Sequence, residues 1–406
     1  MILNILFIAD VSIARVIGGA ERVLFEQSTR LARRGNNVHI LTRRLGLPTS
    51  SSDTIQGVKE WRYDVDVKKN AITFLIQTAR NSKRLCQYVS QEHKIDLINI
   101  FQPFSGLGTF QQSVGRRIKK IYTCHSLSFE EFISRNEKPA GMLQKCLYAL
   151  NVFTRKWIEK RVLLNCDEIL VLSRFTSEKL RDIYKIPEEK TTVIPGGVDL
   201  SHFYPADNKH ALREKYDLPT NKVVLLTVRN LVKRMGLENL VHALKTVVNY
   251  TEDVYLIIGG CGPLKDELIT LTKNLGIDNY VCFTGFIPEA QLADYYRMAD
   301  LFVLPTTELE GFGLVTLEAM ASGLPVVGTP VGGTNEILGQ FDRSLIFEGT
   351  DPDSIAALIL ENSYKIQTNP YQWQSFCRKC RHFVQTHYSW EKNVDALEKH
   401  FPTQPA

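Results

Sequence analysis

The 406-residue sequence lacks long hydrophobic runs, low-complexity segments and short-period repeats. None of its apolar stretches approaches the roughly 20 residues that a membrane-spanning helix requires. The first stretch, MILNILFIAD, has no basic residue before its apolar run and ends in Asp10, so we interpret it as a strand and not as a signal peptide. These absences favour a soluble globular protein, and a content of 44% hydrophobic and 23% charged residues excludes general disorder.

Paired cysteines are also scarce, although the chain has eight cysteines in all. Only Cys377 and Cys380 have Cys-x-x-Cys spacing, and no second pair or histidine cluster completes a zinc site. This usage fits a reduced setting, so we expect a cytoplasmic protein.

Positive charge is concentrated in the first half of the chain. Residues 1–190 contain 31 Lys and Arg against 19 Asp and Glu, whereas the remainder contains 18 against 25. A basic half favours an anionic partner, and the inner face of a membrane is one such surface. Solvated helix faces remain the alternative. The densest clusters are Arg80/Lys83/Arg84 and Arg116/Arg117/Lys119/Lys120.

Strand-like and helix-like segments alternate through most of the chain, which predicts parallel sheets covered by helices on both faces. We expect strands at ILNILFIAD, NVHILT, IDLINI, KKIYTC and EILVLS, and after a Pro- and Gly-rich stretch at KVVLLTV, VYLIIGG, VCFTGF, LFVLP and PVVGTP. The predicted fold is therefore α/β, with two doubly wound, Rossmann-like domains facing a central cleft. The boundaries we expect are 1–195, 196–375 and a C-terminal helical segment, 376–406, that packs back toward the first domain.

Two carboxylates near residue 314 are the first functional candidates. The segment LVTLEAMAS has helical spacing, and Glu318 falls on the same apolar stripe as Leu314 and Leu317. Glu310 lies just upstream in a Gly-flanked turn. Buried carboxylates are rare unless they are paired or bound to a ligand. Phe312, Gly313 and Leu314 open the helix, so their N–H groups can hold a phosphate.

The residues Glu310-Gly-Phe-Gly-Leu-Val-Thr-Leu-Glu318, followed by GLPVVGTPVGGTNEIL, give the C-terminal half a resemblance to the retaining glycosyltransferases of family 4, which have a two-Rossmann-domain fold of the B type. Their signature is Glu-x7-Glu. Further matches extend the resemblance over nearly the whole chain: GGAE at 18–21, YTCHS around His125, VLSRFTSEKL at 171–180, PGGVDLSHFYP at 195–205, IGGCGPL at 258–264, which includes Gly260, and FTGFIP at 283–288.

This resemblance implies a role for each candidate residue. Glu318 would accept hydrogen bonds from the ribose hydroxyls of a nucleotide-sugar donor, and Glu310 and His125 would lie beside the donor sugar. Gly18 and Gly19 would let the backbone approach the donor diphosphate closely, as would the loop at Gly313. Gly260 is assigned to donor binding through its motif.

One basic pair departs from the family pattern. Family members usually place an Arg and a Lys on the diphosphate, and alignment on Leu231-Val232 puts those positions at Asn230 and Met235. The departing nucleoside diphosphate still needs positive charge. We therefore expect Arg229 and Arg234 to provide it, with Lys233 as a weaker substitute.

Four functions stay open on the sequence alone. The first is a retaining transferase that moves a sugar from a UDP- or GDP-sugar to a hydroxyl acceptor, a glycolipid or polysaccharide precursor. The others are an inactive sugar-nucleotide-binding protein, a glycoside hydrolase using Glu310 and Glu318, and an oxidoreductase using Gly259 to Gly262, where Lys265 breaks the Gly-x-Gly-x-x-Gly spacing. We expect no cofactor, no nucleic-acid partner and no metal, and we interpret Asp64-Val-Asp66 and Asp351-Pro-Asp353 as chance Asp-x-Asp matches.

Overall fold

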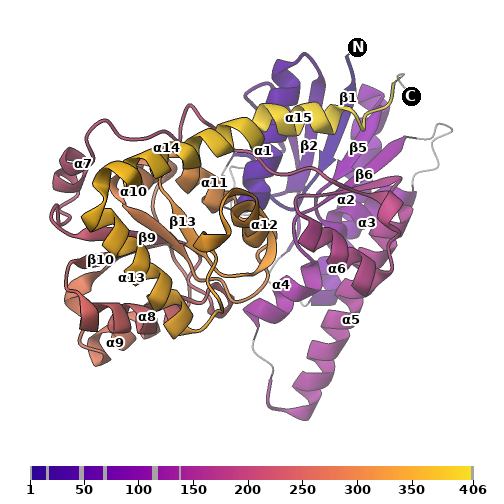
Figure 1. Cartoon of the computed structure of the whole chain (residues 1–406). Helices are drawn as coiled ribbons and strands as arrows, with labels where there is room; N and C mark the ends of the chain where they lie inside the picture. The colour runs from indigo at the N-terminus through magenta and orange to yellow at the C-terminus, as the bar shows by residue number, and fades with distance from the viewer. Residues whose placement is uncertain are drawn as a thin grey trace. The chain divides into compact units, whose positions relative to one another are not determined.

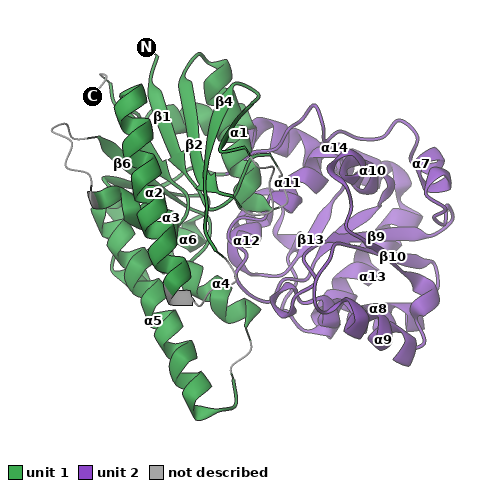
Figure 2. Ribbon diagram, turned by 180° about the vertical axis from the view of Figure 1, so that it is seen from behind, with its two compact units in different colours: residues 1–195, 390–406 green, residues 196–389 purple. Residues whose placement is uncertain are grey.

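The computed structural model describes residues 2–14, 18–44, 50–66, 71–111, 118–136 and 139–403. The chain forms two compact units (Figure 2). Unit 1 consists of Met1–Pro195 and Trp390–Ala406, and unit 2 of Gly196–Ser389. No helix in the described ranges is long and apolar enough to cross a membrane.

Unit 1 contains a sheet of eight strands in the order β3-β4-β2-β1-β5-β6-β7-β8 (Figure 1). All neighbouring strands are parallel except β3 and β4. The strands are β1 Asn4–Ile8, β2 Asn37–Arg43, β3 Ser52–Ile55, β4 Val58–Tyr63, β5 Leu97–Ile100, β6 Lys119–Cys124, β7 Glu168–Val171 and β8 Thr191–Val193. The helices are α1 Gly19–Arg33, α2 Ala71–His93, α3 Pro103–Leu107, α4 Ser128–Arg135, α5 Met142–Asn165, α6 Arg174–Tyr184 and α15 Trp390–Glu398.

The central strands of unit 1 are buried on both faces because helices cover the sheet on each side. Ile5 to Ile8 and Leu97 to Ile100 have no exposed surface. The β3–β4 hairpin is an addition that the sequence analysis did not predict. Gln56 and Gly57 at its tip have φ values of +48° and +85°, the left-handed conformation that a tight hairpin turn requires.

Unit 2 contains a wholly parallel sheet of five strands in the order β11-β10-β9-β12-β13. The strands are β9 Val223–Val228, β10 Val254–Gly259, β11 Val281–Gly285, β12 Leu301–Leu304 and β13 Val326–Gly328. The helices are α7 Lys209–Lys215, α8 Leu237–Tyr250, α9 Lys265–Asn274, α10 Glu289–Met298, α11 Leu314–Ala321, α12 Gly332–Phe341, α13 Pro352–Thr368 and α14 Pro370–His387. The two sheets confirm the predicted fold class of two Rossmann-like α/β domains.

The C-terminal segment divides at a different residue from the one we expected. Residue 376 falls inside α14, which belongs to unit 2, and the chain passes into unit 1 only at Trp390. Within unit 1, α15 packs on α1 through a hydrogen bond from Gln27 Nε2 to Asn393 Oδ1 at 2.9 Å and through ion pairs of Arg34 with carboxylates of α15. Helix α14 continues to His387, and the boundary falls at the break between α14 and α15.

Candidate functional site

The order in which strands are added to the unit 2 sheet reverses between β9 and β12. The loops that follow these two strands carry the main candidate residues. The chain runs from β9 outward to β10 and β11 and then returns to add β12 on the other side of β9. In open parallel sheets, ligands bind outside the carboxyl ends of the strands at such a point. Arg229 directly follows β9, and Glu310 lies in the loop after β12.

Arg229 and Glu310 form a buried ion pair at this edge. The Arg229 Nη2 atom donates to Glu310 Oε2 and to Thr306 Oγ1, the latter at 2.7 Å, and both charged residues are 9% exposed. Thr306 Oγ1 also lies 3.2 Å from Glu310 Oε2. The structure thus joins two residues that the sequence analysis had treated separately, and it adds Thr306, which that analysis missed.

Arg234 lies in the turn η3 (Lys233–Met235) and contacts the backbone of the same loop. Its Nη1 atom donates to the carbonyl of Leu309 at 3.0 Å, and its own carbonyl accepts from Thr307 N at 2.9 Å. Leu309 has a φ of +59°, an unfavourable conformation for a leucine. Met235 is only 6% exposed, so its side chain packs in the core, whereas Asn230 is exposed.

Helix α11 presents the second carboxylate. Its N-cap is Gly313, with a φ of +86°, and its first turn contains no acidic side chain. Glu318 is 8% exposed and accepts a hydrogen bond at 2.9 Å from the hydroxyl of Tyr296, a residue of α10 with no exposed surface. A buried carboxylate needs a partner, and the Tyr296 hydroxyl is one partner of Glu318.

Two further glycines, which we did not single out from the sequence, hold the Glu310 loop in place. Gly332 has a φ of +64°, and a side chain there would put its Cβ 1.9 Å from the Glu310 carbonyl oxygen. Gly333 N donates to the same carbonyl at 2.9 Å, and a Cβ on Gly333 would lie 2.5 Å from Phe312 Cα. The start of α12 therefore packs directly on the loop between Glu310 and Phe312. The signal was the glycine pair after β13.

Gly260 has a packing role in the structure. Its φ is +125°, and an added Cβ would lie 1.8 Å from the Arg229 carbonyl oxygen. Its N–H donates to Gly285 O at 2.7 Å. A donor contact at Gly260 would therefore have to come from its Cα or its carbonyl. This turn also differs from a dinucleotide-binding loop. The glycines of such a loop lead directly into a helix, whereas α9 begins only at Lys265.

In unit 1, His125 directly follows β6 at the carboxyl edge of the sheet. Its ring contacts the ring of Phe101 with 4.8 Å between centroids. Neither ring nitrogen has a hydrogen-bond partner among the described residues, and burial lowers the pKa of His125 to about 4. The imidazole is therefore neutral at pH 7, with one nitrogen able to donate and the other to accept.

Gly18 and Gly19 form the start of α1, as expected for a glycine pair that opens a helix. The first turn of α1 contains Glu21, and a Cβ on Gly18 would lie 2.8 Å from Glu21 Oε2. The Glu21 carboxylate is thus already at the positive end of this helix, where an anionic ligand would otherwise lie.

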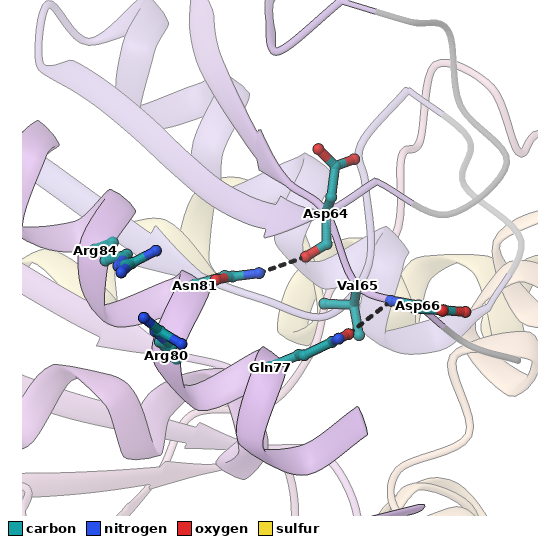
Figure 3. Close-up of a pocket in the computed structure, with 7 residues that line it drawn as sticks. All are labelled: Asp64, Val65, Asp66, Gln77, Arg80, Asn81 and Arg84. Carbon is teal, nitrogen blue, oxygen red and sulfur yellow. Dashed lines mark hydrogen bonds between the residues drawn. The ribbon is translucent and has the colours of Figure 1, made fainter. Parts of the chain in front are cut away.

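The two Asp-x-Asp segments lie in different settings. Asp351 is the N-cap of α13 and accepts from Ser354 N at 2.9 Å. Asp64 and Asp66 line a pocket of about 390 Å³ at the end of β4 (Figure 3). Its lining also includes Gln77, Arg80, Asn81 and Arg84 of α2, and the described residues contain no group of three or more His, Cys, Asp or Glu that could hold a metal ion. Arg116 and Arg117 of the other basic cluster lie outside the described residues.

Two family models match consecutive parts of the chain. The model described as Glycosyltransferase Family 4 matches residues 17–202, and the model described as Glycosyl transferases group 1 matches residues 208–363. A GDP-mannose-dependent alpha-(1-6)-phosphatidylinositol monomannoside mannosyltransferase of Mycolicibacterium smegmatis is 32% identical over 207 residues, 49% of this chain and 54% of that protein. The match therefore spans about half the length of that relative.

A longer match and a solved structure agree with these models. N-acetyl-alpha-D-glucosaminyl L-malate synthase of Bacillus anthracis is 25% identical over 344 residues, 84% of this chain and 83% of that protein. The fold is that of sucrose-phosphate synthase from Thermosynechococcus elongatus, with a TM-score of 0.81 and 23% identity over 98% of each chain. From its two matching models and its fold, the chain belongs to the glycosyltransferases that are built from two Rossmann-like domains.

Proposed function

We propose that the protein is a retaining glycosyltransferase that moves a sugar from a nucleotide-sugar donor to a hydroxyl acceptor, a glycolipid or polysaccharide precursor, without a metal ion. The observation that carries this proposal is the Arg229–Glu310 pair at the switch point of the unit 2 sheet, next to the start of α11. A buried ion pair at a ligand-binding edge is costly to keep unless its groups act there.

The donor nucleotide would bind to unit 2. Glu318 would accept hydrogen bonds from the two ribose hydroxyls, because an ionised carboxylate has several acceptor positions and no donor of its own. The diphosphate would lie against the N–H groups at the starts of α11 and α12, neither of which has an acidic side chain in its first turn. Arg234 would add positive charge from the neighbouring turn.

The reacting sugar would lie beside Glu310. Arg229 compensates the charge of Glu310, and a bound diphosphate would compete for the same guanidinium group. Glu310 would then be freed in part to stabilise the positive charge that develops at the anomeric carbon, while Arg229 stabilises the departing phosphate. The neutral imidazole of His125 would donate a hydrogen bond to a sugar hydroxyl.

The acceptor would bind to unit 1, whose excess of basic residues suits an anionic acceptor. Gly18 and Gly19 would then allow close approach of the donor phosphate to α1, although Glu21 opposes it electrostatically. Gly260 would act through the tight packing of its turn on Arg229.

The test is a panel of UDP-, GDP- and dTDP-sugars, including GDP-mannose, assayed for nucleotide release with and without glycolipid acceptors. We expect release with one donor class, product with the donor's anomeric configuration by NMR, and unchanged rates in EDTA. Donor binding without turnover would leave a sugar-nucleotide-binding protein, and an inverted anomeric centre would contradict the retaining mechanism. Hydrolysis of simple glycosides would favour the hydrolase.

A further inference from the structure

Helix α5 carries an unusual exposed apolar surface. Besides Met142, six of its large hydrophobic side chains are more than half exposed, although the helix belongs to a well-packed unit. We call these residues the α5 stripe: Leu143 at 74%, Leu147 at 58%, Leu150 at 55%, Phe153 at 65%, Trp157 at 51% and Leu164 at 52%. Met142, at the helix start, is 84% exposed. Single exposed hydrophobics need no explanation, but a contiguous set indicates a binding surface.

The spacing of the stripe places its members on one face of the helix. At 100° per residue, they fall within an arc of about 120° that runs the length of α5. A different face packs on unit 1 and contains the buried residues Ile158, Glu159, Val162 and Leu163. The stripe is therefore not a loosely packed core face, since the core face of this helix is already occupied.

The first half of α5 projects beyond the other helices of unit 1 (Figure 2). Nearly every side chain from Met142 to Leu150 is exposed, and Tyr148, which packs against the ring of Phe132, is the exception. An apolar helix end that extends into solvent gains stability only if another apolar phase covers it.

The charges of α5 identify that phase. The helix contains five basic residues and one acidic residue, Glu159, which is fully buried. Lys145, Lys160 and Arg161 are exposed, and Arg161 lies over the Trp157 ring. Exposed leucine, phenylalanine and tryptophan beside lysine and arginine are typical of helices that lie in the interface of an anionic membrane.

We propose that α5 docks unit 1 on the surface of an anionic lipid bilayer. The α5 stripe enters the boundary between headgroups and acyl chains, and Arg161, within its arc, and Lys160, at its edge, meet the phosphates. A second copy of the chain is a poorer occupant, because α5 offers no exposed carboxylate to the basic residues of another α5. The basic clusters noted in the sequence would add only long-range attraction.

The experiment is co-sedimentation of the full chain with phosphatidylcholine vesicles, with and without phosphatidylglycerol, in the absence of donor and acceptor. Its result is therefore independent of the proposed glycosyl transfer. We expect binding to the anionic vesicles only, weakened by salt. A variant with Leu147→Ser, Leu150→Ser and Phe153→Ser should bind roughly tenfold less or weaker still, since three interfacial side chains are removed at exposed positions.

Matched controls lie on α2 of the same unit. Ile76 and Tyr88 are exposed apolar residues there, at 62% and 50%, so an Ile76→Ser, Tyr88→Ser variant should bind like the parent. Brominated lipid should quench Trp157, and a Trp157→Phe variant should keep binding but lose most of that quenching.

Three results would overturn the proposal. The first is a parent that binds the two vesicle types equally, and the second is an α5 variant that binds as the parent does. The third is a parent dimer in sedimentation velocity that the α5 variant splits, which would assign the stripe to a second copy.

Discussion

The carboxyl edges of the two sheets both carry bonded polar groups, but the charged residue that follows the first strand differs in sign between the two units. In unit 1, Asp10 follows β1, pairs with Arg43 at 3.1 Å, and its N–H donates to Gln102 after β5 at 2.7 Å. In unit 2, Arg229 follows β9 and pairs with Glu310 after β12. In each unit, polar side chains bond across the point where the strand order reverses. The sign of the group after the first strand is opposite in the two units.

The helix starts extend the contrast. The first helix of unit 1 has Glu21 in its first turn, whereas α11 and α12 of unit 2 have no acidic residue there. An anion near a helix start gains from the dipole only if no carboxylate is already present. Unit 2 therefore suits a diphosphate better than unit 1 does, and the predictions below test that difference.

The largest expected effect is on stability, from breaking the pair at the edge of unit 2. Arg229→Ala leaves Glu310 buried without its cation and should lower the free energy of unfolding by about 3–5 kcal/mol. Calorimetry of the full chain measures this loss. The double variant Arg229→Met, Glu310→Met should recover much of it while remaining inactive.

Asn230→Ala, an exposed change in the same segment, is the control and should leave the melting temperature unchanged. If Arg229→Ala has the melting temperature of the parent, the Arg229–Glu310 pair does not stabilise the edge of unit 2. The main difference that we draw between the two units would then be wrong.

The second effect concerns donor affinity. Glu318→Ala should raise the donor KM by roughly 10- to 100-fold, since it removes charge-assisted hydrogen bonds. Glu318→Gln should be milder because the amide oxygen still accepts. Tyr296→Phe removes only the hydroxyl that donates to Glu318 and should change KM least of the three. An unchanged donor KM in Glu318→Ala would remove the ribose role.

These residues show what sequence reasoning could reach. The sequence analysis named Glu310, Glu318 and Arg229 as candidates from their motifs and, for the two carboxylates, from expected burial. The contact between Arg229 and Glu310 could not be predicted from the sequence. It depends on the pairing of β12 with β9, and these two strands are not consecutive in the chain. Tyr296 was missed for a related reason, since nothing in α10 marks that residue as the one facing α11.

The third effect is a pH dependence in unit 1. The pKa of His125 falls from 6.5 to about 4 on burial, so the unfolded chain binds a proton there that the folded chain does not. This contribution to stability is present above pH 6.5 and is lost as pH falls toward 4, by about 1–3 kcal/mol. Denaturant titrations from pH 7 to pH 4 measure it. His125→Phe should flatten the acid limb, and an identical pH profile in that variant would show that the titrating group lies elsewhere.

The smallest effect concerns Glu21. Glu21→Gln removes a first-turn carboxylate from α1 and should cost about 0.3–1 kcal/mol of stability. Urea denaturation detects this change, and Glu178→Gln, at an exposed position in the second turn of α6, provides a matched carboxylate away from the helix start. A stabilised Glu21→Gln variant would mean that the carboxylate is not favourably placed.

The fold shows the same division between local and non-local information. Every strand that we predicted from a short apolar run is present, because such runs bounded by turn residues are typical of buried strands. The β3–β4 hairpin was missed although Gln56-Gly57 marks its turn, since Ser52 to Ile55 contains few apolar residues and is largely exposed. The break at Trp390 depends on contacts of α15 with α1 that local patterns do not encode.

The most direct test is hydrogen–deuterium exchange of the full chain with and without its nucleotide-sugar donor. The account predicts slower exchange at the start of α11, from Gly313 to Leu317, and at the start of α12, from Thr334 to Ile337. Exchange at the start of α1, from Ala20 to Val23, should change less. Protection confined to α1, with α11 and α12 unchanged, would place the diphosphate in unit 1 and contradict the account.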